Sequence, residues 1–207
     1  MAEIRVGYFL EDVGQEAFVV GLVKRIAEQV GLATDDLSHD SRSTVGGKGT
    51  ATTELRRFLR DVTRGSERLF DILTVAIDGN CQGYAGKRKE IKRKAEQTGY
   101  PGTVVCIVPD PHIERWYLAD ATALAHVMGA DIQPKVPTYK CERGRYKDAL
   151  RDAFRQAGII APLGGAEYGA EVAAALDLYA VGKADAGFKH SVDDLRAALS
   201  LFRETQE

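Results

Sequence analysis

The chain has 207 residues, of which 44% are hydrophobic and 28% are charged, and its formal net charge is -2 at pH 7. These proportions are ordinary for a folded globular protein and argue against disorder, and no apolar run reaches the roughly 18 residues that span a bilayer. Because the whole chain is slightly acidic, any attraction to nucleic acid must come from a local basic patch.

The length predicts one well-buried domain with at most a small appendage. The first residues lack the pattern of a signal peptide, so we expect a cytoplasmic protein without a membrane segment. The three cysteines, Cys81, Cys106 and Cys141, are odd in number and lack CxxC spacing. This pattern argues against a disulfide framework or a zinc site, and we expect reduced thiols.

The first apolar run, at 4–10, is rich in strand formers and leads into an acidic turn that contains Glu11 and Glu16. A helix over about 15–30 should follow, because apolar residues recur there at helical spacing and Gly31 can end it. The sequence therefore predicts a unit of strand, acidic turn and helix at the start of the chain.

The next segment is polar, and its only strand candidate, at 37–41, is expected at a sheet edge. The glycine-rich loop at 45–50 lacks the leading glycine and the Ser or Thr of a nucleotide-binding P-loop. Thr53 is a candidate cap for a helix that ends near Gly65.

The central apolar run, at 72–77, predicts a strand buried on both faces, and it ends in Asp78 and a glycine-rich turn that contains Asn80. A basic helix is expected over 87–95. A solvated surface explains most such charge runs, but a contact with phosphates is the alternative that its place near Asp78 suggests. The cations in question are Lys87, Arg88, Lys89, Lys92 and Arg93.

A further buried strand is predicted at 103–108, and Asp110 is expected to cap a helix whose first residue is Pro111. On that helix Glu114 falls inside the arc of apolar residues. A buried carboxylate needs a cation, a metal or a proton, so Glu114 is either part of a site or half of a structural ion pair.

The tail is predicted to be helical, with helices over about 145–156, 166–179 and 191–202, the last with a capping box formed by Ser191 and Asp194. The chain is thus an α/β protein with a Rossmann-like parallel sheet. We expect an α/β core over 1–128 and a helical extension over 129–207 that packs on it.

Acidic residues follow the predicted strands. If the first and third strands are neighbours and the weak second strand lies at the edge, Glu11 and Asp78 meet where ligands bind in open α/β sheets. Clustered carboxylates repel one another, and a hard cation such as Mg²⁺ relieves that repulsion. Such a site can support phosphodiester cleavage.

These residues resemble the Toprim domains of primases, topoisomerases and overcoming-lysogenization-defect nucleases, and more closely a group of small Toprim-like bacterial proteins. Glu11 matches the glutamate after the first strand, and Asp78-Gly79-Asn80 stands in place of Asp-x-Asp. Glu114 and Trp116 match a glutamate and a tryptophan after a proline-rich turn. The tail is similar only around Lys147 and 164–167.

The chain departs from the Toprim pattern at three positions. Asp12 replaces the usual glycine, Glu16 is one residue later than the second acid of the nucleases, and Asn80 replaces the second aspartate. The loss of one negative charge at Asn80 should weaken metal binding.

The resemblance implies an Mg²⁺- or Mn²⁺-dependent nuclease that cleaves nucleic acid, with DNA favoured. In that case Glu11, Asp78 and Glu114 are metal ligands, Asn80 is a neutral ligand and Glu16 is an auxiliary one. Lys147 would act with Glu11 and Asp78 in catalysis. The resemblance further implies antiviral defence beside an ATPase partner, and it leaves self-association open.

Two other functions fit the same residues. A Toprim-like module that has lost catalysis could serve as a binding or regulatory subunit, and Asn80 favours that hypothesis. A receiver-like domain could use Asp78 as a phosphoacceptor, although Glu114 and the long helical tail speak against it.

Overall fold

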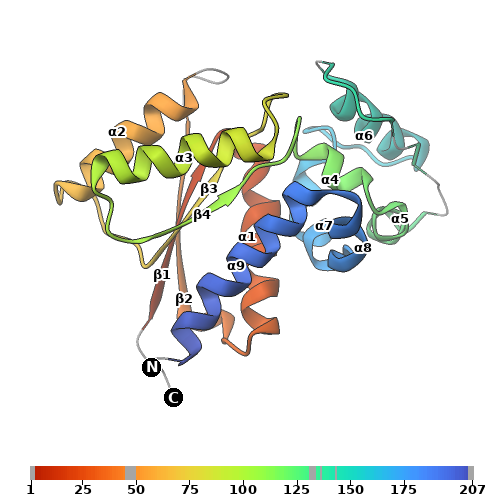
Figure 1. The fold of residues 1–207 in the computed structure, drawn as a ribbon. Helices are drawn as coiled ribbons and strands as arrows, with labels where there is room; N and C mark the ends of the chain where they lie inside the picture. The colour runs from red at the N-terminus through yellow and green to blue at the C-terminus, as the bar shows by residue number, and fades with distance from the viewer. Residues whose placement is uncertain (1–2, 45–49, 131–133, 136, 143, 205–207) are drawn as a thin grey trace.

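The structure is a computed structural model that describes residues 3–44, 50–130, 134–135, 137–142 and 144–204. Its centre is a sheet of four parallel strands in the order β2-β1-β3-β4 (Figure 1). The strands are β1 (Ile4–Leu10), β2 (Leu37–Ser43), β3 (Ile72–Ala76) and β4 (Thr103–Ile107). The predicted edge position of β2 and the pairing of β1 with β3 are confirmed.

Helices cover both faces of this sheet. Figure 1 shows α2 and α3 on one face and α1 with α9 on the other. The described helices are α1 (Glu16–Gln29), α2 (Ala51–Thr63), α3 (Tyr84–Thr98), α4 (Glu114–Leu118), α5 (Ala121–Met128), α6 (Arg145–Gln156), α7 (Gly169–Ala175), α8 (Leu178–Ala184) and α9 (Ala186–Glu204). None of these is long and apolar enough to cross a membrane.

The central strand β3 explains why its sequence is a continuous apolar run. Its side chains alternate between two hydrophobic clusters, with Ile72 and Ala76 on the α1 and α9 face and Leu73 and Val75 on the α2 and α3 face. All five residues of β3 are buried. A strand with helices on both sides has no polar face, so the run that predicted it was not alternating.

The tail helices share the hydrophobic core of the sheet. Phe188 and Leu195 of α9 are fully buried in the same cluster as Val6 and Ile107, which belong to β1 and β4. The α/β fold class and the helical character of the described tail are confirmed.

Three predicted helix caps are wrong. Thr53 lies inside α2, which begins earlier because Ala51 is buried in the core. Ser191 lies inside α9, where its hydroxyl donates to the carbonyl of Gly187, while Asp185 caps the helix by accepting from the amide of Phe188. Both helices therefore begin earlier in the chain than the polar residue that was expected to cap them, and buried apolar residues lie in the added turn.

Asp110 is not a cap either, because α4 begins only at Glu114. One oxygen of Asp110 accepts from the amide of Cys81 at 2.9 Å, and the other accepts from the hydroxyl of Tyr139 at 2.8 Å. Asp110 therefore joins the turn after β3 to the segment before α6. The predicted helix over 166–179 is also divided, into a short turn, α7 and the start of α8.

The prediction of three reduced thiols is wrong for two of them. Cys81 and Cys141 form a disulfide between residues 60 positions apart, whereas Cys106 is free and buried. Their spacing carried no sign of this pairing, because only the tertiary fold brings the two loops together. The glycine-rich segment 45–49, for which a P-loop was rejected, lies outside the described residues.

Candidate active site

Glu11 and Asp78 lie side by side at the carboxyl ends of β1 and β3, as the sequence predicts. The amide of Glu11 donates to the carbonyl of Ala76 at 2.9 Å, which continues the pairing of the two strands. The amide of Asp78 in turn donates to Oε2 of Glu11 at 2.8 Å. Both residues are buried, with 7% of Glu11 and 9% of Asp78 exposed. The strand order alone therefore places two buried acids in contact.

Two further polar residues hold Asp78, and sequence reasoning missed both of them. Nε2 of Gln15 donates to Oδ1 of Asp78 at 2.8 Å, while Oε1 of Gln15 accepts from the amide of Glu11 at 3.2 Å. Nδ1 of His112 lies 2.8 Å from Oδ2 of Asp78. An ionised carboxylate only accepts, so Nδ1 of His112 carries the hydrogen when Asp78 is charged. Gln15 and His112 are themselves buried.

Glu114 and Lys147 form the other side of the site. Nζ of Lys147, on α6, lies 3.5 Å from Oε1 of Glu114 and 4.0 Å from Oδ2 of Asp12. The remaining oxygen of Glu114 is buried and has no hydrogen-bond partner among the described residues. Glu114 is thus buried, as its helical position predicts. Its ion pair with Lys147 of the tail involves only one of its two carboxylate oxygens.

Burial and mutual repulsion disturb the titration of these acids. Burial raises the pKa of Asp78, and the charge of Glu11 adds to that rise, although the hydrogen bond with His112 opposes it. Burial also raises the pKa of Glu114, against the attraction of Lys147. Partial burial lowers the pKa of Lys147, but the surrounding acids outweigh it, so that this pKa is raised overall. Burial is therefore the main cause of the raised pKa of both acids.

A cavity of about 350 Å³ opens beside these residues. It lies between the turn after β1, the start of α4 and the helix α6. The side chains that give it chemical character are Asp12, Gln15, Asp78, Glu114, Lys147 and Arg151. A small charged group of a substrate can reach Asp78 and Lys147 from this cavity.

Two residues predicted for the metal site point elsewhere. Oε1 of Glu16 accepts from the hydroxyl of Ser41 at 2.5 Å, at the edge strand β2. The amide nitrogen of Asn80 donates to the carbonyl of Asp78 at 3.2 Å, and Asn80 does not line the cavity. The structure thus brings Glu11, Asp78, Glu114 and Lys147 together, but not Glu16 or Asn80.

The cations of the basic helix α3 divide into two groups. Lys87 is buried and pairs with Glu90, and Arg88 pairs with Asp194 of α9. Lys92 donates to the carbonyl of Val104. Within the described part of the chain, no ion pair or hydrogen bond is found for the remaining predicted contacts, the exposed Lys89 and Arg93.

The donor chemistry of the site fits a hard divalent cation. All candidate ligands are oxygen donors, and there are three carboxyl groups for one nearby lysine, Lys147. One buried oxygen of Glu114 has no hydrogen-bond partner among the described residues. Among the described residues, however, no three acidic, histidine or cysteine side chains lie close enough together to hold a metal ion as they stand, so the acids would have to draw closer around one. Asp78, Glu11 and Glu114 are the residues that would hold the ion.

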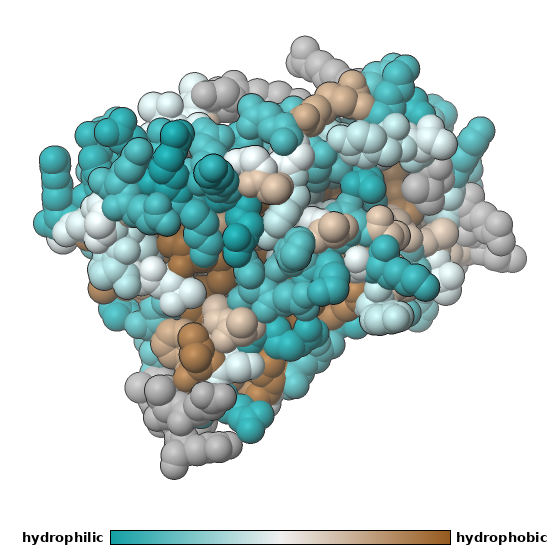
Figure 2. Space-filling view, viewed as in Figure 1, coloured by the Kyte–Doolittle hydropathy of each residue, from teal (hydrophilic) through white to brown (hydrophobic). Residues whose placement is uncertain are grey.

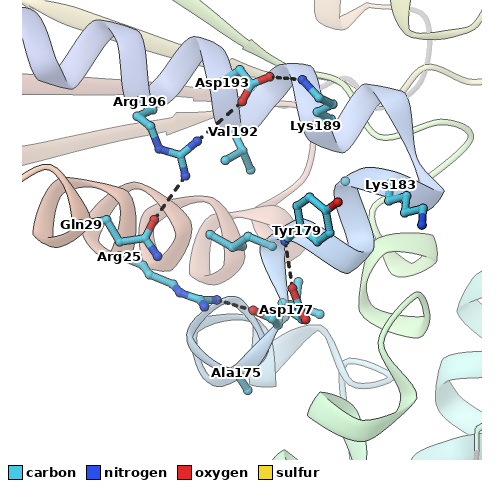
Figure 3. Close-up of a pocket in the computed structure, with 13 residues that line it drawn as sticks. Arg25, Gln29, Ala175, Asp177, Tyr179, Lys183, Lys189, Val192, Asp193 and Arg196 are labelled. Carbon is cyan, nitrogen blue, oxygen red and sulfur yellow. Dashed lines mark hydrogen bonds and ion pairs between the residues drawn. The ribbon is translucent and has the colours of Figure 1, made fainter.

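A larger cavity, of about 710 Å³, lies away from the strand ends, between α1, α8 and α9 (Figure 3). Most of its charged side chains are already engaged. Asp193 pairs with Lys189 and Arg196, Arg196 also reaches Gln29, and Arg25 donates to two backbone carbonyls at the end of α7. The contacts of Arg25 and Gln29 fasten the tail to α1, whereas the pairs of Asp193 lie within α9. We therefore place the candidate site in the smaller cavity, where the strand-end acids lie.

We expect Glu114→Gln to stabilise the metal-free protein increasingly as pH rises. The raised pKa of Glu114 means that the folded state binds more protons than the unfolded state above the ordinary value of 4.5. Its contribution to stability therefore falls as pH rises through this window, and glutamine avoids that loss. Melting temperatures in EDTA between about pH 4 and pH 7 should show a growing difference in favour of the variant.

A structural ion pair predicts another result for the same melts. If the pair of Glu114 with Lys147 stabilised the fold, the variant would melt below the wild type and the deficit would grow as Glu114 ionises. Glu142→Gln is the matched control, because Glu142 also pairs with a lysine, at 3.3 Å, but on the surface. It should change the melting temperature little.

Comparison of the chain with protein-family models, with curated proteins and with solved structures found no match.

Proposed function

We propose that this protein is a divalent-cation-dependent nuclease whose site is formed by Glu11, Asp78, Glu114 and Lys147. One observation carries the proposal: Glu11 and Asp78 are buried in contact at the carboxyl ends of β1 and β3, and Asp78 lines a cavity together with the buried Glu114 of α4 and Lys147. Buried acids with raised pKa values are costly to the fold, and such sites are often functional. Mg²⁺ or Mn²⁺ is the cation that this oxygen-rich set would take.

Each residue has a distinct role in this proposal. Gln15 and His112 fix the two oxygens of Asp78, and Glu11 fixes its backbone amide. Lys147 is half exposed at the cavity and can bind a phosphate oxygen through its ammonium group. A bound divalent cation would offset the negative charge that develops on the phosphoryl group during cleavage.

The resemblance of the sequence motifs to those of Toprim-like proteins suggests further parts of the proposal. It suggests a Toprim-like nuclease that acts on DNA in antiviral defence, in the cytoplasm and beside an ATPase partner. Self-association is compatible with this role.

A cleavage assay tests the proposed activity. Purified protein should cut DNA in the presence of Mg²⁺ or Mn²⁺ but not in EDTA, and Asp78→Asn should abolish that cleavage. Asp71→Asn is the matched control, because Asp71 precedes the same strand at its other end and accepts from the amide of Arg5. Cleavage that persists in Asp78→Asn, or no cleavage with either cation, would refute the nuclease.

A second candidate function is a Toprim-like binding or regulatory subunit without catalysis. It is favoured by the hydrogen bonds that occupy both oxygens of Asp78 and by the orientation of Asn80, whose amide is turned onto the backbone. This alternative predicts partner or nucleic-acid binding by a protein that cuts nothing.

A further inference from the structure

A basic groove of about 770 Å³ runs along the outer face of α3 and ends against α9. Four cations and one acid line it, an excess of three positive charges in a chain whose net charge is -2. The charged lining residues are Arg88, Lys89, Lys92, Arg93 and Glu96. The surface over α3 is correspondingly hydrophilic in Figure 2. This local excess can attract phosphates although the whole chain cannot.

Not all of these positive charges are neutralised by ion pairs within the protein. Arg88 is neutralised by Asp194, at 2.9 Å. Lys92 donates to a neutral carbonyl and keeps its full charge. Lys89 and Arg93 are exposed, and among the described residues neither has an ion pair or hydrogen bond. They are four residues apart, so they project from the same side of the helix about 6 Å apart along its axis.

The groove also contains a stacked pair of aromatic rings. Tyr84, the first residue of α3, and His190 of α9 have ring centroids 5.2 Å apart and an angle of 11° between their planes. Tyr84 is half-buried and His190 is exposed, so the pair offers an aromatic surface at the groove. Tyr84 follows Asp78 by only six residues, which limits their separation to about 22 Å of extended chain.

We propose that this groove binds a single-stranded segment of nucleic acid, with an unpaired base stacked on the Tyr84–His190 pair and phosphates bound by Lys89 and Arg93. Stacking on a protein ring needs a base with an exposed face. Inside a duplex, both faces of each base are covered by the neighbouring bases. Cations alone would bind duplex and single strand alike. The inference names the substrate class of the nuclease proposed above and rests on that function, but its binding test needs no cleavage.

Binding can be measured in EDTA by fluorescence anisotropy, with one labelled sequence prepared as single-stranded DNA, as single-stranded RNA and as duplex DNA. The wild type should bind both single strands more tightly than the duplex. Because stacking of one base contributes roughly 1 to 3 kcal/mol, His190→Ala should weaken single-strand binding at least about fivefold and leave duplex binding unchanged. His190→Tyr keeps a ring and should restore the affinity.

Two sets of variants separate stacking from charge. Tyr179→Ala removes an exposed aromatic ring from α8, outside the groove, and should have no effect. Reversing Lys89 and Arg93 to glutamate should reduce the slope of log affinity against log salt by roughly 0.7 for each lost contact with a single strand. Equal affinity of the wild type for single strand and duplex, or unchanged single-strand affinity in His190→Ala, would overturn the inference, even if the protein proves to be a nuclease. If the protein does not cleave nucleic acid but binds single strands as described, the binding role of the groove is supported and the proposed nuclease activity is refuted.

Discussion

Reduction of the disulfide between Cys81 and Cys141 is expected to lower the free energy of unfolding by roughly 4 kcal/mol. The bond joins residues 60 positions apart, and a cross-link over a loop of that length restricts the unfolded chain strongly. For a chain of this size, such a loss corresponds to a fall in melting temperature of roughly 8 to 16 °C. Thermal melts and urea unfolding curves, with and without a reductant, measure both quantities.

The double variant Cys81→Ser/Cys141→Ser is the control for this prediction. It should melt like the reduced wild type and should not respond to the reductant. Cys106 is buried and free, so mass spectrometry after denaturation should count one reactive thiol in the oxidised protein and three in the reduced one. Three reactive thiols in protein that was never reduced would show that the disulfide does not form. Identical melting curves with and without the reductant would show the same.

The position of this disulfide connects stability with the candidate site. Cys81 follows Asp78 by three residues, and Cys141 precedes Lys147 by six. Asp110 makes a second connection between the same two segments through its bonds to Cys81 and Tyr139. The loop that carries one acid of the site and the helix that carries its lysine are therefore tied together twice.

The second large effect is expected for Asp78→Asn, which should weaken the binding of divalent cations by more than about a hundredfold without unfolding the protein. Asparagine can still accept from Gln15 through its side-chain oxygen, and it removes the charge that burial makes unfavourable. The metal-free variant should thus melt at or above the wild-type temperature at neutral pH. A cation bound at the proposed site, however, would lose a charged ligand.

The sheet could be predicted from the sequence because its physical causes are local. Continuous apolar runs mark β1, β3 and β4, and the polar composition of β2 marks an edge. Once β1 and β3 are neighbours, the residues that follow them must meet. The contact of Glu11 with Asp78 therefore followed from strand order, without any knowledge of side-chain positions.

The partners of Asp78 could not be predicted in the same way. Gln15 is a single polar residue at the start of a helix. His112 lies in a loop after β4, where neither the periodicity of apolar residues nor the spacing of a known motif distinguishes it. Both are functional candidates only because tertiary packing buries them against a carboxylate. The only sign available for Gln15 was its position four residues after Glu11, in a turn that must pass over the strand ends.

Lys147 and the disulfide show the same limit over longer separations. The sequence indicated that Glu114 needs a cation, but the choice of Lys147 depends on how α6 packs beside α4. Likewise, which cations of α3 are engaged within the protein depends on the positions of Glu90, Asp194 and the backbone carbonyl of Val104. Charge patterns predict which residues need partners, whereas the fold decides which partners they find.

The central claim is that Asp78 and its neighbouring acids bind a divalent cation, and calorimetric titration tests it most directly. Mg²⁺ and Mn²⁺ are titrated into metal-stripped wild type, Asp78→Asn and the control Asp71→Asn. We expect saturable binding to the wild type and to Asp71→Asn, and affinity reduced by more than about a hundredfold in Asp78→Asn. Identical isotherms for the wild type and Asp78→Asn, or no binding to the wild type, would contradict the claim.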